Sequence, residues 1–153
     1  MQRKSTFLYL LVFFLTACSG NSRVETVDVK TTVMGVLTRQ VEDWNRGSVK
    51  DFMAGYWQND SLKFVSGGSV TYGWQETLDR YLNRYDTAEK MGQLTFDDVH
   101  IRVLGRDTAI ADGRWALGYP DRPGSEGRFT LLFQRIGGQW RIVYDHTSLK
   151  QAV

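Results

Sequence analysis

The residue best suited to chemistry in the C-terminal part of the chain is His146, which belongs to an alternating segment, residues 140–148. Counting every second residue from Trp140 places Tyr144 and His146 on one face of a predicted strand and Asp145 on the other. An imidazole can act as a base, an acid or a hydrogen-bond donor near neutral pH. The alternation therefore predicts that His146 lines a pocket with an apolar floor. A half-buried structural histidine would fit the same pattern, so the catalytic residues stay unknown.

A large set of aromatic residues is the second feature. Such side chains can form the wall of a pocket for a flat apolar ligand, and tyrosine hydroxyls can orient its polar groups. For any single member of the set, a place in the core is the simpler explanation. Together with His146, the residues predicted to line a ligand-binding pocket are Trp44, Tyr56, Phe64, Tyr72, Tyr81, Tyr85, Trp115 and Phe129.

The carboxylates of the predicted strands mostly alternate with apolar residues and so fall on the opposite face. Asp97 and Asp98 lie on one predicted strand, and Asp112 with Arg114 lies on the next. We expect Asp112 and Arg114 to form an ion pair at the surface or at an interface. This pattern gives little support to chemistry that needs a buried carboxylate.

The sequence contains none of the common metal or phosphate motifs. His100 and His146 are the only histidines, and alternation predicts that they lie on opposite faces of the sheet. No HExxH, CxxC or calcium-loop pattern occurs, and the paired glycines fall in predicted hairpins rather than in a phosphate loop. We therefore expect neither a metal ion nor a cofactor.

Residues 1–17 have the pattern of a secretory leader. Arg3 and Lys4 precede an apolar run, residues 7–15, which is shorter than the roughly 20 residues of a membrane-spanning helix. The sequence Leu-Thr-Ala-Cys that ends at Cys18 resembles the lipobox of bacterial lipoproteins. The resemblance implies cleavage before Cys18 and lipidation of that cysteine, which would anchor the chain to a bilayer of the cell envelope. An ordinary signal peptide followed by a spare cysteine is the alternative.

The lipoprotein interpretation also predicts a location and a domain plan. Ser19, rather than Asp, follows the cysteine, which favours the outer membrane over the inner one and a domain that faces the periplasm. Residues 18–26 then form the lipidated cysteine and a polar tether, and residues 27–150 form one folded domain. The formal charge of +2 falls to zero once residues 1–17 are removed, so nothing in the charge favours nucleic-acid binding.

Hydrophobic spacing predicts helices in the N-terminal half of the chain and strands in the C-terminal half. Glycine pairs at residues 67–68 and 137–138 predict β-hairpins, because glycine accepts the positive φ angles of tight turns. The expected helices are residues 27–46, 49–56 and 74–85, and the expected strands are residues 62–66, 69–72, 94–104, 108–119, 128–135 and 140–148. This order predicts an α+β domain.

The order of elements and several short signatures resemble the nuclear transport factor 2-like superfamily, and within it the SnoaL-like and DUF4440 groups. The resemblance implies a cone, in which a strongly curved antiparallel sheet wraps around three N-terminal helices and encloses a cavity. It also implies a homodimer formed through the outer face of the sheet. The signatures are Trp44-Asn45-Arg46-Gly47, then Asp51, Phe52 and Tyr56, then Phe64 before a glycine turn, then Gly73-Trp74, and finally Trp140-Arg141-Ile142 with Asp145-His146-Thr147-Ser148.

This superfold hosts many unrelated activities, so the resemblance implies no single function. An aromatic cavity without a convincing acid–base pair favours a membrane-anchored domain that binds a small, mostly apolar molecule or serves as a scaffold. The alternative is an isomerase, cyclase or dehydratase of the SnoaL or ketosteroid-isomerase type, with His146 or a buried aspartate as proton shuttle. A protein-interaction module is a third possibility. A carboxylate or His146 inside the cavity, within about 3 Å of a tyrosine hydroxyl, would favour the enzyme.

Overall fold

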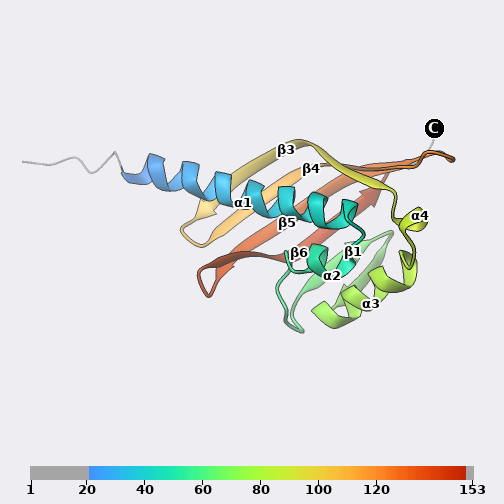
Figure 1. Ribbon diagram of the computed structural model, residues 1–153. Helices are drawn as coiled ribbons and strands as arrows, with labels where there is room; N and C mark the ends of the chain where they lie inside the picture. Colours follow the sequence, from blue (N-terminus) through green and yellow to red (C-terminus); the bar gives the residue numbers. More distant parts are fainter. Residues whose placement is uncertain (1–20, 151–153) are drawn as a thin grey trace, which may run out of the picture.

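The computed structural model describes residues 21–150, with side chains from residue 28 onward, and it confirms the predicted α+β arrangement (Figure 1). The predicted leader and Cys18 lie outside the described residues. In chain order the elements are α1 (Asn21–Asn45), α2 (Val49–Met53), β1 (Lys63–Ser66), β2 (Ser69–Tyr72), α3 (Trp74–Arg84), α4 (Ala88–Met91), β3 (Gln93–Gly105), β4 (Thr108–Gly118), β5 (Ser125–Ile136) and β6 (Gln139–Leu149).

The six strands form one sheet in the order β2-β1-β6-β5-β4-β3. All neighbouring strands are antiparallel except β1 and β6, which are parallel. Figure 1 shows α1 lying along the long strands, with α2 and α3 near β1 and β2. This arrangement leaves space between the sheet and the helices for side chains from both.

The first helix begins at Asn21, before the expected start at residue 27, and buries the predicted apolar stripe. Val33 and Leu37 are almost completely inaccessible to solvent. Their spacing of four residues keeps them on one side of the helix, which lies against β3. Within residues 21–150, no helix combines the length and the apolar character that a membrane span requires.

Hydrogen bonds from side chains to the backbone connect the helices to each other and to the sheet. The indole Nε1 of Trp74 donates to the carbonyl of Met53 at 2.9 Å, which joins α3 to α2. The indole Nε1 of Trp44 donates to the carbonyl of Met91 at 3.2 Å. That carbonyl belongs to the short helix α4, which the sequence did not predict and whose N-cap is Thr87.

The hairpin between β5 and β6 turns at Gly137 and Gly138, as predicted. Their φ angles are 57° and 80°, and the flanking residues Ile136 and Gln139 pair directly. Two positive φ angles in a two-residue loop define a type I′ turn, whose twist matches that of the strands it joins. The local sequence was sufficient for this prediction because the turn needs only residues that tolerate positive φ.

A β-bulge at Val143 reverses the alternation of β6. Leu132 pairs with Tyr144 but the next residue, Phe133, pairs with Ile142, which leaves Val143 as the extra residue. Ile142, before the bulge, is fully buried. After the bulge the inward positions are odd-numbered, so Asp145 is buried whereas His146 is exposed. The prediction that Tyr144 and His146 share the inner face with Trp140 was therefore wrong.

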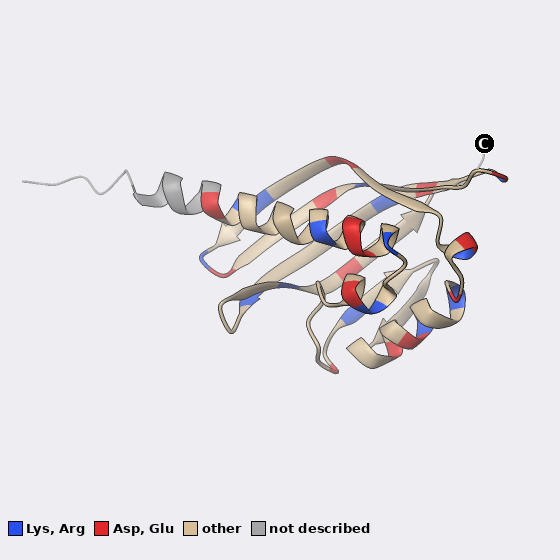
Figure 2. Ribbon diagram, viewed as in Figure 1, with Lys and Arg blue, Asp and Glu red and all other residues tan. Residues whose placement is uncertain are grey.

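Charged residues of the outer face pair across strands rather than along one strand. Arg114 binds Asp97 of β3 at 3.2 Å, and Arg128 binds Asp98 at 2.8 Å. Figure 2 shows basic and acidic residues interspersed on these described strands. The predicted pair between Asp112 and Arg114 does not form, because a residue directly opposite on the next strand is closer than the second residue along the same strand.

Candidate functional site

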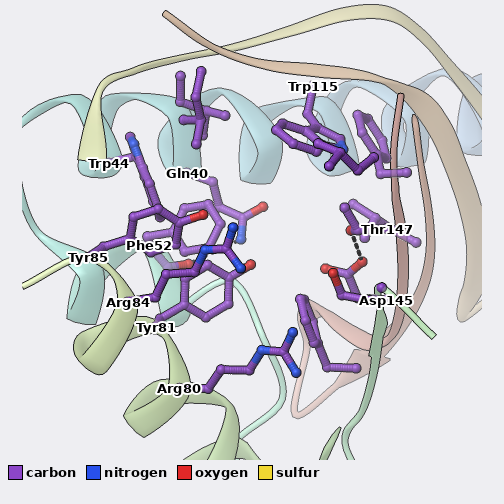
Figure 3. A pocket seen from close by; sticks show the side chains of 18 of the residues that line it. Gln40, Trp44, Phe52, Arg80, Tyr81, Arg84, Tyr85, Trp115, Asp145 and Thr147 are labelled. Atoms are coloured by element: carbon purple, nitrogen blue, oxygen red, sulfur yellow. Dashed lines mark hydrogen bonds between the residues drawn. The ribbon is translucent and has the colours of Figure 1, made fainter. Parts of the chain in front are cut away.

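A cavity of about 370 Å³ lies between the sheet and the helices (Figure 3). This volume lies near the lower end of the range that is usual for small-molecule sites. Its walls come from α1, α2 and α3 on one side and from the strands on the other. Besides tyrosines, the polar residues that line it are Gln40, Ser66, Ser69, Arg80, Arg84, Asp145, Thr147 and Ser148.

The helical wall is a cluster of aromatic rings. Trp44 of α1 contacts Phe52 of α2 and Tyr85, with ring centroids 5.1 and 4.7 Å apart. Tyr81 of α3 contacts Phe52 at 5.5 Å and Phe64 of β1 at 5.7 Å. Several of these contacts are edge-to-face, a geometry that the ring quadrupoles favour. The cluster gives the cavity a firm apolar surface that would accept a flat ring.

The carboxyl group of Asp145 is buried in the sheet side of the cavity, with only 3% of the residue exposed. The hydroxyl of Tyr56 donates to its Oδ2 atom at 2.7 Å, and the hydroxyl of Thr147 donates to its Oδ1 atom at 2.7 Å. Figure 3 shows Asp145 and Thr147 together, across the cavity from Trp44 and Tyr85. Each carboxylate oxygen thus keeps one further lone pair for a ligand or a water molecule.

Backbone pairing places Tyr56 beside this carboxyl group. Phe64 of β1 lies opposite Asp145 of β6 in the parallel ladder. In the segment after α2, the amide of Trp57 donates to the carbonyl of Ile142 at 2.9 Å, and the amide of Ile142 donates to the carbonyl of Gly55 at 3.0 Å. These bonds fix the intervening Tyr56 beside β6, so its hydroxyl reaches Asp145.

Burial raises the pKa of Asp145 to about 6 from its ordinary value of 3.8. Hydrogen bonds from Tyr56 and Thr147 act in the opposite direction and limit the rise, and so does the electrostatic influence of the neighbouring His146. Burial also raises the pKa of Tyr56 and Tyr81 well above the ordinary value for tyrosine, and the charge of Asp145 adds to both effects. The tyrosines therefore keep their protons near neutral pH, whereas Asp145 can gain or lose one.

Two arginines of α3 supply positive charge to the same cavity. Arg80 donates from Nη1 to the Thr71 hydroxyl at 3.3 Å, and its guanidinium lies 5.4 Å from the Phe64 ring centroid. Arg84 lies 5.6 Å from the ring centroid of Tyr85. Figure 3 shows both side chains extending from α3 into the cavity. Neither arginine forms an ion pair with a carboxylate of residues 28–150.

Comparison with known proteins identifies the family. The model of the SnoaL-like domain matches residues 30–151, which is most of the chain. The chain belongs to the SnoaL-like family. None of the curated proteins matches this SnoaL-like chain.

Solved structures support the same assignment. A nuclear transport factor 2-like protein of unknown function from Shewanella oneidensis is 37% identical, with a TM-score of 0.75 over 78% of this chain and 98% of that one. A second such protein of unknown function, from Pseudomonas putida, is 16% identical, with a TM-score of 0.71 over 84% of this chain and 91% of that one. The predicted nuclear transport factor 2-like fold, with its curved and mainly antiparallel sheet, is therefore confirmed.

A third structure carries a functional name. It is a nuclear transport factor 2-like protein from Streptomyces avermitilis whose name suggests a dehydratase. It is 23% identical to this SnoaL-like domain, with a TM-score of 0.67 over 83% of this chain and 100% of that one. At this level of identity the likeness shows a shared fold alone.

Most residues predicted to line a pocket do line the cavity of this SnoaL-like domain. Two do not. Tyr72 is 61% exposed, because it lies on the edge strand β2 next to Lys63 and on the outer side of the sheet. His146 is exposed because the bulge at Val143 turns it outward. The residues that the cavity does include are Trp44, Tyr56, Phe64, Tyr81, Tyr85, Trp115 and Phe129.

The strand alternation did not predict the polar residues that matter most in the cavity. The alternation predicts carboxylates outside the cavity, which is correct for Asp97 and Asp98 but wrong for Asp145. The alternation also predicts the two histidines on opposite faces, but His100 and His146 are both exposed. The spacing of Arg80 and Arg84, four residues apart around Tyr81, was a usable signal for a shared helix face. Within residues 28–150, no cluster of three or more His, Cys, Asp or Glu residues could hold a metal ion.

Proposed function

We propose that this SnoaL-like domain binds a small, mostly apolar molecule in its cavity. Asp145 then removes a proton from one position of that molecule and returns it at another. The observation that carries this proposal is a buried carboxyl group, 2.7 Å from the Tyr56 hydroxyl, on the wall of an aromatic cavity. Among the functions compatible with the sequence, this geometry favours an isomerase or dehydratase over a scaffold. Both reactions need a group that removes a proton from carbon or oxygen at one position and returns it at another.

The chemistry assigns different roles to the two residues. Asp145 is largely ionised near neutral pH because its pKa is about 6, so it can act as the base. Its surroundings are apolar, which strengthens the electrostatic interaction between the carboxylate and an acidic proton of the ligand. Tyr56 orients the carboxylate and keeps its own proton, which it can share with Asp145 as the charge on that group changes.

Proton exchange in deuterium oxide tests this proposal. Two probes are suitable, the neutral ketone 2-tetralone and the carboxylated ketone phenylpyruvate, because both have an apolar ring and an acidic C–H bond. We expect the protein to accelerate deuterium incorporation into at least one of them above the buffer rate, as measured by mass spectrometry. Native mass spectrometry of the same mixtures reports binding without chemistry. Binding without exchange would support the binding function and contradict the proton-transfer step.

We also propose that Cys18 is lipidated and anchors the domain to the periplasmic side of a bacterial envelope membrane, with the outer membrane favoured over the inner one. The supporting observation is the sequence around Cys18 together with the apolar run before it. Replacing Cys18 with Ser is expected to move the protein from the membrane fraction to the soluble fraction in a bacterial host. Intact-mass measurement would show loss of the acyl chains. An unmodified wild-type Cys18 would contradict the proposal.

A homodimer through the outer face of the sheet is a further proposal. Ile110, Leu132 and Tyr144 lie side by side on neighbouring strands and form an apolar row on that face. Burying such a row is favourable, because the free energy of the system falls when apolar surface is removed from water. Light scattering should give twice the monomer mass, and Leu132→Glu should give the monomer mass. The control is Gln134→Glu, which lies on the same strand outside the row and should leave the dimer intact. A monomeric wild-type protein would contradict the proposal.

A further inference from the structure

We propose that the cavity selects an organic carboxylate, whose charged group binds Arg80 and Arg84 and whose apolar body fills the aromatic part. This inference rests on the proposed binding function of the cavity and adds the chemical class of the ligand. The observation behind it is the placement of two arginines on one side of a largely aromatic cavity.

The position of the two arginines follows from helix geometry. They are four residues apart on α3, so their side chains leave the same face of the helix, on either side of Tyr81. Each guanidinium group lies over an aromatic ring, that of Arg80 at 5.4 Å from the Phe64 centroid and that of Arg84 at 5.6 Å from the Tyr85 centroid. Such cation–π contacts favour some orientations of a long side chain over others, which lowers the entropy lost when it binds a ligand.

Arg80 and Arg84 line the cavity and have no carboxylate partner in residues 28–150, unlike four arginines elsewhere in the domain. Arg46, Arg114, Arg128 and Arg135 each bind a carboxylate within the described residues. Arg80 instead contacts a neutral hydroxyl, that of Thr71, and a ring. Asp145 also lines the cavity, but its hydrogen bonds come from Tyr56 and Thr147 rather than from an arginine. The α3 side of the cavity therefore has positive charge that no carboxylate of residues 28–150 neutralises.

An organic carboxylate fits this charge and this shape better than inorganic phosphate. A guanidinium presents two parallel N–H groups that match the two oxygens of a carboxylate. The rest of the wall is aromatic and favours a ring or chain of carbon atoms over a second charged group. Inorganic phosphate would satisfy the arginines but would leave the aromatic surface without a partner.

The same geometry orients the ligand toward the proposed base. Figure 3 shows Arg80 and Arg84 on the α3 side and Asp145 with Thr147 on the sheet side. A molecule whose carboxylate binds the arginines would extend its apolar body across the cavity, toward Asp145. The arginines would then act as positioning residues, because they hold the ligand without taking part in the proton transfer.

Affinity measurements with a charged and an uncharged probe test the inference. The probes 2-naphthoate and 2-naphthamide share one ring system and differ in charge, and calorimetry on the purified full-length protein gives both affinities. We expect 2-naphthoate to bind at least about tenfold more tightly, as a charge-assisted hydrogen bond allows. The double variant Arg80→Gln with Arg84→Gln should remove this preference and leave the affinity for 2-naphthamide unchanged.

Further variants control for folding and for general charge effects. Arg102→Gln removes an exposed arginine on the outer face of β3 and should leave both affinities unchanged. Arg80→Lys with Arg84→Lys keeps the charge but loses the paired N–H groups, and should retain part of the preference. The single variants Arg80→Gln and Arg84→Gln replace the double variant if its thermal unfolding midpoint shows that it does not fold.

The outcomes separate this inference from the function on which it rests. The carboxylate assignment would be overturned if the wild-type protein bound the two probes with equal affinity. It would also be overturned if the glutamine variants lost affinity for both probes to the same extent. In either case the cavity would remain a binding site. Phosphate that binds as tightly as 2-naphthoate would also overturn it. Arginine-dependent binding of 2-naphthoate without proton exchange on any probe would support the inference and contradict the proton-transfer step. No binding of either probe would contradict both.

Discussion

Replacing Asp145 with Asn is expected to lower the rate of proton exchange on a bound ketone by about 100-fold or more. The amide is nearly the same size as the carboxyl group but cannot accept a proton at neutral pH. It also presents an NH₂ group to one of the two hydroxyls, of Tyr56 and Thr147, that now donate to the carboxylate. The measurement is deuterium incorporation into 2-tetralone or phenylpyruvate by wild type and variant at equal protein concentration.

The pH dependence gives a second readout for the same variant. As a base, Asp145 acts when ionised, so the wild-type exchange rate should rise with pH through about 6 and then level off. The stability effect has the opposite sign. Because burial raises the pKa of this group from 3.8 to about 6, the native state binds more protons than the unfolded state between these values. The contribution of Asp145 to the free energy of unfolding therefore decreases as pH rises across that window, and the Asp145→Asn variant would lack this dependence.

The matched control is Asp112→Asn, which changes the same groups at an exposed position on the outer face of β4. We expect it to leave exchange and its pH profile unchanged. Equal activity of wild type and the Asp145→Asn variant would show that the buried carboxyl group has a structural role only. The domain would then be a binding protein or a scaffold, as the sequence first suggested.

Replacing Phe133 with Ala is expected to lower the free energy of unfolding by about 3–5 kcal/mol. Phe133 is fully buried and pairs with Ile142, also fully buried, next to the bulge at Val143. Loss of its ring leaves a cavity that the strands on either side cannot fill. A domain of this size has a free energy of unfolding of only about 5–15 kcal/mol, so the variant should lose a large fraction of it.

Denaturation by urea, followed by tryptophan fluorescence, measures this change. Phe133→Leu is the matched control, because it keeps an apolar side chain of similar volume and should lose less than about 1.5 kcal/mol. A loss below about 1 kcal/mol for Phe133→Ala would mean that the ring is not packed as described. Phe133 does not line the cavity, so the variant should affect activity only through the fraction of folded protein.

Local sequence patterns were sufficient for most of the architecture. Val33 and Leu37 lie at helical spacing and are buried as predicted, and Gly137-Gly138 forms the expected hairpin turn. These features depend on residues that are neighbours in the sequence, so they can be predicted from local sequence patterns. The short helix α4 was missed because four residues are too few to show a period.

The aromatic part of the site was also predictable, but its polar part was not. Trp44, Tyr81 and Tyr85 line the cavity because the apolar face of a helix packs toward the sheet, where these large rings are removed from water. His146 was chosen from alternation, and alternation holds only while the strand stays in register. Its neighbour Asp145 is the residue that points inward.

The sequence by itself determined the α+β order, the two hairpin turns and the aromatic character of the interior, because these arise from local conformation and from hydrophobic spacing. Only the tertiary structure decided which polar groups enter the cavity. The bulge at Val143 depends on the pairing of β6 with β5 and also with the segment after α2, and that segment is distant from β6 in the sequence. One extra residue there turns Asp145 inward and His146 outward, and so changes a candidate imidazole site into a buried carboxyl site.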